Sequence, residues 1–207
     1  MSQARERIDK RNRGAWDTMQ SDPEKALAMA SEALAESEAE GYALGRADAI
    51  LNIGWCENYL ARKGPAISSF QRSLEAFTAL DDKVGVMKSL NALGVAYHEV
   101  GRLDRAMDYY TRSLEEARSC GNRWREAVTL SNIGEICLDL GELKEALDYF
   151  LRAYETVPDD RESELVSNIL LNIGTTFQRM ENWLLAREFT EKALMLAEEA
   201  GDKMAAS

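Results

Sequence analysis

The sequence predicts an all-α solenoid built from about five helix-turn-helix repeats. Glycines and alanines each recur every 40 residues, and two further columns keep the same register. A constant period of roughly 20–50 residues is typical of solenoid proteins. The columns are Gly14, Gly54, Gly94, Gly134 and Gly174; Ala26, Ala66, Ala106, Ala146 and Ala186; Ala33, Ser73, Ser113, Ala153 and Ala193; and Leu34, Leu74, Leu114, Tyr154 and Leu194.

Each 40-residue unit is expected to contain two helices. In the clearest unit, Val84 to Val100 carries a broad apolar stripe at helical spacing, and Leu103 to Ala117 carries a second one. Gly101 separates them, as a residue in the left-handed region often does after a helix. The next unit repeats this plan, with helices expected at Trp124–Leu140 and Leu143–Thr156.

The starts of the other second helices have local signals. Asp22-Pro23-Glu24 places a capping side chain and a proline in the first turn, and Lys63-Gly64-Pro65 is similar. Asn182 precedes the last full helix, which is expected to begin near Trp183. The first unit is polar and acidic, which is typical of the terminal cap of a solenoid.

The recurring small residues predict a close approach of helices within each unit. Gly94 and Ala106 are placed where the two helices of one unit cross. A glycine inside a helix costs about 0.5–1 kcal/mol relative to alanine. Because the chain repeats this cost in every unit, a packing requirement for a missing side chain is expected.

The whole chain, residues 1–207, is predicted to form one domain. The repeats are expected at approximately 3–41, 42–81, 82–121, 122–160 and 161–201. Residues 202–207 fall in register with the first turns of earlier first helices. We therefore expect them to begin a truncated sixth repeat, and we expect the sequence to be a segment of a longer protein.

Composition and charge exclude several classes of partner. The chain is 45% hydrophobic and 29% charged, which indicates a globular protein, and its net charge of −11 opposes nonspecific nucleic-acid binding. There is no apolar run that could span a bilayer and no apolar core of a signal peptide. Cys56, Cys120 and Cys137 lack metal or redox spacing. These observations predict a cytoplasmic protein without nucleic-acid or membrane partners.

The residues of known catalytic and metal-binding patterns are missing. His98 is the only histidine, and the sequence has no phosphate loop, nucleophile elbow or Cys-x-x-Cys motif. The carboxylate pairs Asp81-Asp82 and Asp159-Asp160 fall between units, where solvated loop acids are expected. The sequence therefore predicts no enzyme activity, no catalytic residue, no cofactor and no metal.

The chain resembles the tetratricopeptide repeat family, in the longer form with 40-residue repeats found in scaffold and bacterial signalling proteins. The resemblance covers about residues 3–201 and is clearest in one unit, with Asn91-Ala92-Leu93-Gly94, Tyr97, Gly101, Leu103, Ala106, Tyr110, Ser113 and Leu114. It implies a right-handed α-α superhelix whose first helices line a concave groove. It also implies a protein or peptide partner.

Columns that vary between units point to residues of such a groove. They lie on one predicted face of the first helices, and free variation fits either a specific binding face or an unselected solvent face. Trp55 and Tyr59 stand one turn apart and either anchor a peptide or pack on the neighbouring unit. The predicted groove residues are Trp55, Asn58, Tyr59, Lys88, Asn91, His98, Glu135, Gln178 and Arg179.

A column of asparagines offers another candidate surface. Asn12, Asn52, Asn132 and Asn172 each stand two residues before a repeat glycine. Their amides either grip an extended peptide backbone or, as the more usual outcome, form buried hydrogen bonds to the next helix.

These observations favour a non-enzymatic protein-interaction module that captures a peptide or a partner helix in its groove. Two alternatives remain open from the sequence. The chain could be the N-terminal regulatory region of a bacterial signalling enzyme, such as a diguanylate cyclase or a sensor kinase. It could also form homo-oligomers through an uncapped C-terminal face.

Overall fold

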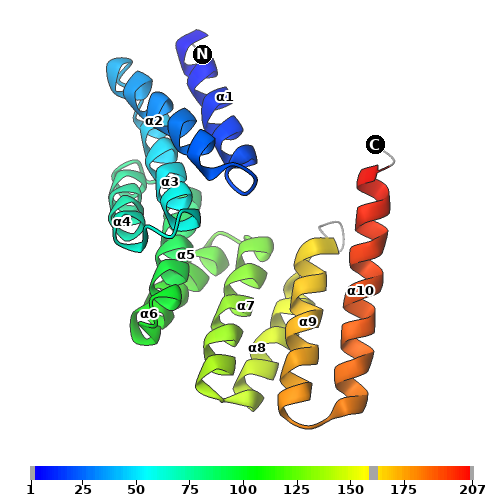
Figure 1. Ribbon diagram of the computed structural model, residues 1–207. Helices are drawn as coiled ribbons and strands as arrows, with labels where there is room; N and C mark the ends of the chain where they lie inside the picture. Colours follow the sequence, from blue (N-terminus) through cyan, green and yellow to red (C-terminus); the bar gives the residue numbers. More distant parts are fainter. Residues whose placement is uncertain (1–2, 159–162, 206–207) are drawn as a thin grey trace. The chain divides into compact units, whose positions relative to one another are not determined.

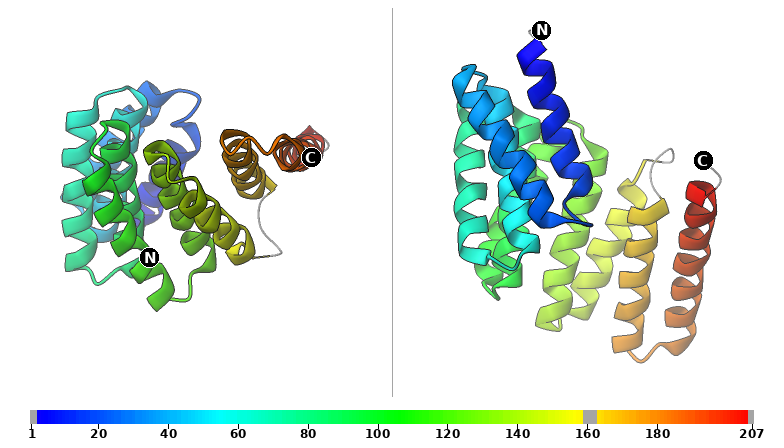
Figure 2. Two further views of the ribbon diagram at one scale, coloured as in Figure 1. Left: turned by 90° about the horizontal axis from the view of Figure 1, so that it is seen from below. Right: turned by 45° about the horizontal axis from the view of Figure 1, so that its top comes forward.

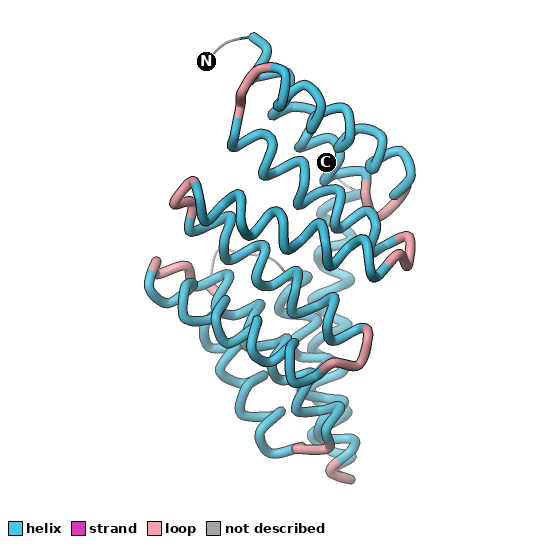
Figure 3. The backbone as a smooth tube through the Cα atoms, turned by 90° about the vertical axis from the view of Figure 1, so that its left-hand side faces the viewer, coloured by secondary structure: helices cyan, strands magenta, loops and turns pink. Residues whose placement is uncertain are grey.

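The computed structural model describes residues 3–158 and 163–205 of the chain (Figure 1). Within these residues the structure has ten helices joined by short turns, and it has no strand (Figure 3). The predicted acidic pair Asp159-Asp160 lies outside the described residues. The helices are α1 (Gln3–Thr18), α2 (Pro23–Ala39), α3 (Ala43–Tyr59), α4 (Lys63–Ala79), α5 (Lys83–Glu99), α6 (Leu103–Ser119), α7 (Arg123–Leu140), α8 (Leu143–Thr156), α9 (Ser163–Arg179) and α10 (Trp183–Ala205).

Successive helices form antiparallel pairs, which confirms the predicted fold of about five helix-turn-helix repeats. The chain divides into two compact units, Met1–Ser113 and Leu114–Ser207. In the first unit α1 packs on α2, α3 on α4, and α2 and α4 each contact the helix that follows. In the second unit α7 packs on α8 and α9 on α10, and the two views in Figure 2 show α9 and α10 side by side.

The turns between helices repeat as regularly as the helices. A residue with positive φ stands at one position in each described turn from Gly41 onward, at a spacing of 20 residues up to Gly141. Four of these positions are glycines, including Gly101, as the sequence predicts. Ala61, Asp81 and Glu181 occupy the same backbone conformation without being glycine. In these three turns a side chain with a Cβ atom occupies the left-handed region, which is less favourable for it than for glycine.

The predicted helix starts are confirmed. The Asp22 carboxylate caps α2 by accepting from the backbone N–H of Lys25 at 3.0 Å, and Pro23 is the first residue of the helix. Helix α4 begins at Lys63 and α10 at Trp183, as expected. Polar side-chain caps therefore mark the starts of α2 and α10, whereas α4 begins without one.

The repeat glycines make room for a ring of the partner helix. A Cβ atom on Gly94 would lie 2.3 Å from the ring of Tyr110, and one on Gly54 would lie 2.5 Å from Phe70. Gly134 has the same relation to Phe150, at 2.7 Å. All three rings are almost completely buried. In these three pairs the predicted close approach is therefore an aromatic ring packed against a glycine, whereas Gly14 faces Met29 and Gly174 faces Thr190.

A neighbouring pair of columns varies in a coordinated way. Where Tyr97 of α5 stacks on Tyr109 of α6, with ring centroids 5.4 Å apart, the equivalent residues of α3 and α4 are Glu57 and Ser69. The Ser69 hydroxyl donates to the Glu57 carboxylate at 2.8 Å. The stacked pair of Tyr97 and Tyr109 is thus replaced by the hydrogen-bonded pair of Glu57 and Ser69. Both pairs join the two helices of their repeat, so the fold is the same.

The last helix differs from the other second helices. Helix α10 has 23 residues and continues to Ala205, through the position at which Gly41 and Gly121 end the corresponding turns of earlier repeats. The division of the chain into repeats, including a sixth that begins at residue 202, stays a prediction.

The contact between glycine and ring gives a stability prediction. Gly94→Ala should lower the free energy of unfolding by about 1–3 kcal/mol, because the new methyl group overlaps the buried Tyr110 ring. Gly64→Ala is the matched control, since a Cβ there meets nothing within 4 Å and the residue is in a helix. The control should be neutral or stabilising by up to about 1 kcal/mol. Urea unfolding followed by circular dichroism measures both, and equal effects would contradict the packing argument.

The strained turns give a second prediction with the opposite sign. Ala61 has φ of 58°, so Ala61→Gly should raise the free energy of unfolding by about 1 kcal/mol through relief of this strain. The same change at Ala35, an exposed residue inside α2, should lower it by a similar amount. Thermal unfolding distinguishes the two variants, and a loss of stability in both would refute the strain at Ala61.

Candidate functional site

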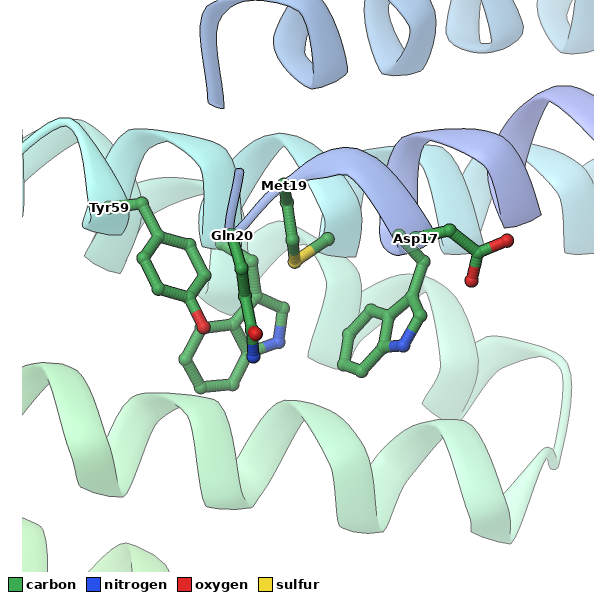
Figure 4. Close-up of a pocket in the computed structure, with 6 residues that line it drawn as sticks. Asp17, Met19, Gln20 and Tyr59 are labelled. Carbon is green, nitrogen blue, oxygen red and sulfur yellow. The ribbon is translucent and has the colours of Figure 1, made fainter. Parts of the chain in front are cut away.

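A pocket of about 390 Å³ opens in the first unit between the end of α1 and the end of α3 (Figure 4). Its lining contains three aromatic side chains and only one charged group, Asp17. The Trp16 side chain is 50% exposed and that of Tyr59 is 47% exposed. The lining residues are Trp16, Asp17, Met19, Gln20, Trp55 and Tyr59.

Two elements of secondary structure present these residues. Tyr59 is the last residue of α3, and Met19 and Gln20 lie in the turn that follows α1. In Figure 4 the side chains of Tyr59 and Gln20 extend from their backbones in the same direction. Because the end of one helix and the turn after another meet here, side chains of adjacent repeats share one pocket.

A buried apolar cluster supports the pocket from below. Met19, Ala26 and Cys56 form this cluster, and Trp55 and Leu27 pack against it. Met19 is 3% exposed, so only a small part of its surface lines the pocket. Close packing of this kind holds the lining side chains in one arrangement before any ligand arrives.

Trp55 packs against its neighbours and also lines the pocket. Its ring meets Phe70 of α4 edge to face, with centroids 5.2 Å apart and planes inclined by 65°. It is partly buried by this contact and by the cluster around Met19, and it still lines the pocket. Tyr59, one turn further along α3, is the more exposed member of the pair.

The other predicted groove residues of the first unit are mostly buried. Asn58 and Asn91 are nearly inaccessible, whereas Lys88 and His98 are half-buried. Lys63 Nζ donates to the side-chain and backbone oxygens of Asn58 at 3.2 Å, and to a Glu99 oxygen at 2.6 Å. Asn58 thus contributes to a polar link between α3, α4 and α5.

The predicted groove residues of the second unit lie on α7 and α9. Glu135 accepts a hydrogen bond from the Asn172 amide at 3.1 Å. Arg179 donates to the backbone carbonyl of Leu138, near the end of α7, and Gln178 is exposed. Glu135 and Arg179 therefore each bond to the neighbouring first helix. The role of these residues in ligand binding stays a prediction.

The asparagine column forms hydrogen bonds between repeats, as the second interpretation expects. The Asn52 amide on α3 donates to the backbone carbonyl of Asn12 on α1 at 3.0 Å. The Asn12 amide donates in return to the carbonyl of Gly45 on α3 at 2.9 Å. Both side chains are buried, so they join successive first helices rather than face a ligand.

Asp48 on α3 is the acid with the most perturbed environment. Its carboxyl has a pKa of about 6, because burial raises the pKa strongly, Lys88 partly lowers it, and Asp82 and Asp9 add smaller increases. The predicted groove residue Lys88 is therefore the charge that partly offsets the burial of Asp48.

The chemistry of metal sites and reactive thiols is missing from the described part of the chain. Residues 3–158 and 164–198 contain no group of three or more His, Cys, Asp and Glu side chains that could hold a metal ion. Burial raises the pKa of the Cys56 thiol to about 11 and that of Cys137 above its usual value. Cys56 and Cys137 are buried free thiols, whereas the free thiol of Cys120 is exposed. No helix of the described residues is long and apolar enough to cross a membrane.

Sequence reasoning missed Trp16, together with Asp17 and Gln20. Trp16 stands in a column whose other members, Cys56, Ala96, Ile136 and Thr176, are completely buried. Cys56 packs with Met19, in the turn after α1, and with Ala26 of α2, whereas the Trp16 side chain is half exposed. A large aromatic residue in a column of small and aliphatic ones was the signal that could have identified it.

Comparison with known proteins identifies the repeats. Residues 66–119 and 85–159 match the model of the tetratricopeptide repeat family. A comparison with curated proteins finds no match.

Solved structures share the fold over almost the whole chain. The Rap conjugation gene regulator of plasmid pLS20 in complex with the Phr* peptide is 18% identical, with a TM-score of 0.80 over 91% of this chain and 52% of the other. NprR in complex with its cognate peptide NprX is 21% identical, with a TM-score of 0.72 over 87% of this chain and 52% of the other. The TPR-like repeats of a putative kinesin light chain from Podosopora anserina are 10% identical, with a TM-score of 0.71 over 98% of this chain and 99% of the other. The chain thus spans about half the length of the first two proteins. At these low sequence identities, the similarity establishes a common fold and nothing further.

The environment of Asp48 gives a prediction for stability against pH. The folded state retains the Asp48 proton up to about pH 6, whereas the unfolded chain releases it near pH 4. Since the folded state binds more protons in this window, the free energy of unfolding falls as the pH rises through it. Asp48→Asn should therefore be more stable than the wild type at pH 8, by on the order of 2 kcal/mol, and nearly equal to it at pH 4.

Chemical unfolding at a series of pH values measures this difference. Asp108→Asn is the matched control, because Asp108 is an exposed acid on α6 within the same unit. Its stability should follow the wild type at every pH. Parallel curves for the wild type and Asp48→Asn would show that burial of this carboxylate costs nothing.

Proposed function

We propose that the chain, which matches the tetratricopeptide repeat family over residues 66–119 and 85–159, works as a non-enzymatic interaction module that binds a peptide segment of a partner protein. The segment docks on the ends of α1 and α3, in the pocket between Trp16 and Tyr59. The proposal rests on one observation above others, which is the gathering of three aromatic side chains around a preformed pocket on two adjacent repeats.

The residue types of the pocket suit protein recognition. Tryptophan and tyrosine are enriched among residues that dominate binding energy, because each buries a large rigid surface with few rotatable bonds. Gln20 adds an amide that can donate to and accept from a peptide backbone. The pocket therefore offers both an apolar anchor and a polar group for orientation.

Rigidity of the supporting core favours binding by this surface. Trp55 is held by Phe70 and by the cluster of Met19, Ala26 and Cys56. A ligand that docks on fixed side chains loses less affinity to the ordering of the protein. The remaining predicted groove residues, from Asn58 to Arg179, stay candidates for secondary contacts along the first helices.

Two structurally similar proteins support a peptide as the ligand. The Rap regulator of pLS20 and NprR both have this fold and were crystallised with peptides. The description of the former as a gene regulator also supports the alternative that these repeats regulate a longer signalling protein. In that case the bound segment would belong to the same chain, and the pocket would have the same chemistry.

Self-association is a second candidate function, and a separate observation favours it. Helix α10 exposes several large apolar side chains, namely Trp183, Leu184, Leu194 and Met195. Clusters of exposed apolar side chains often mark contact surfaces. Sedimentation of the wild type and of a Leu194→Glu/Met195→Glu variant distinguishes this function from peptide capture.

The pocket gives a prediction for partner binding. Peptides selected by the wild-type protein from a random library displayed on phage should bind Tyr59→Ala and Trp16→Ala at least about ten-fold more weakly. Both side chains are about half exposed, so their removal should leave the thermal unfolding temperature nearly unchanged. Fluorescence polarisation with the selected peptides measures the affinities.

Matched controls come from the second unit. Tyr154 on α8 is 45% exposed and Trp183 on α10 is 64% exposed, and neither lines the pocket. Tyr154→Ala and Trp183→Ala should retain the wild-type affinity. Equal weakening by the control variants, or failure to select any peptide, would overturn the proposed function.

A further inference from the structure

The pocket of Trp16, Trp55 and Tyr59 has ring faces that the chain itself leaves open to a cation. Elsewhere the protein repeatedly places its own cations over aromatic rings, at 4.6–5.6 Å from the ring centroids. Six such pairs involve Tyr42, Tyr97, Tyr109, Trp124, Tyr149 and Phe189. Among the described residues, no lysine or arginine lies over Trp16, Trp55 or Tyr59. Within the described part of the chain, Tyr154 and Trp183 are also exposed rings without an internal cation, but only Trp16, Trp55 and Tyr59 gather around one pocket.

The charges around the pocket favour a positive ligand. Asp17 is the only charged residue of the lining, and it is negative. Lys63 follows Tyr59 closely in sequence, but its ammonium group is held by Asn58 and Glu99, and it does not line the pocket. The chain as a whole has a net charge of −11, which attracts basic segments over long distances.

The chemistry of the rings fits the same ligand. The negative face of an indole attracts ammonium and guanidinium groups more strongly than any other side-chain ring does. Two of the three rings here are indoles, and the third is a phenol. A pocket of about 390 Å³ is large enough to receive the end of a long side chain.

From these observations we propose that the pocket of Trp16, Trp55 and Tyr59 binds a lysine or arginine side chain of the partner peptide by cation–π contacts. The inference rests on the proposed function and specifies the ligand class for that site. Asp17 contributes through the local electric field, since in Figure 4 its carboxylate is directed away from Tyr59. The apolar stem of the bound side chain lies against the rings while its charged end meets their faces.

The indole N–H signals of the protein provide a direct test. The chain has four tryptophans, Trp16, Trp55, Trp124 and Trp183, and only the first two line the pocket. The probes are three blocked pentapeptides of alternating glycine with lysine, norleucine or glutamate. They are titrated separately into ¹⁵N-labelled full-length protein and followed by proton–nitrogen correlation spectra.

The lysine peptide should shift the signals of Trp16 and Trp55 in a saturable way and leave those of Trp124 and Trp183 in place. Its affinity should exceed that of the norleucine peptide at least ten-fold, and the glutamate peptide should produce no shift. Tyr59→Ala should weaken the lysine peptide, whereas Tyr154→Ala should not. Asp17→Asn should weaken it by a smaller factor, and the Asp17 effect should disappear at high salt.

Other outcomes separate this inference from the proposed function. Equal or tighter binding of the norleucine peptide would overturn the assignment of a cation and make the pocket an apolar anchor, while peptide binding itself would stand. A lysine peptide without effect on Trp16 and Trp55 would likewise overturn it. If the phage selection then still yields peptides that need Tyr59, the proposed function survives alone.

Discussion

The packing of a ring against a glycine is the constraint on which the three middle repeats depend. Phe70, Tyr110 and Phe150 lie where a side chain on Gly54, Gly94 or Gly134 would stand. The two helices of a pair can approach this closely only because one of them gives up its Cβ atom, at a cost of about 0.5–1 kcal/mol in helix propensity. Burial of a phenyl or phenol ring contributes more than this cost, since a large apolar side chain is worth roughly 1.5–3 kcal/mol. The glycines therefore recur at this period because the same packing contact recurs in these repeats.

This dependence explains why the fold could be predicted from the sequence almost completely. Helix positions follow from the period, and the starts of α2, α4 and α10 follow from local polar caps and prolines. Coordinated substitutions, such as Glu57 with Ser69 in place of two stacked tyrosines, needed the structure for their explanation. A residue that departs from the pattern of its column can be explained only together with the residue that it contacts. A single sequence does not identify that contact.

The site was less predictable, because variation between repeats has two physical origins. Tyr59 and Gln178 vary on exposed surface, whereas Asn58 and Asn91 vary because each is fitted to a different buried neighbourhood. Periodicity alone treats both kinds of position alike. Trp16 was missed for the converse reason, since it is half exposed although the other members of its column are completely buried. The exposure of a position thus differs between repeats and does not follow from the period alone.

The exposure of Trp16 also accounts for the location of the pocket. A column that holds Cys56, Ala96 and Ile136 in the interior becomes surface on α1, so a large side chain fits there without disturbing a neighbour. A single exposed tryptophan would need no explanation. Here it meets Trp55 and Tyr59 of the next repeat around one pocket, over a core that is already packed. Substitutions at these exposed positions would therefore change the surface of the pocket, while the packed core, including the contact of Gly54 with Phe70, stays the same.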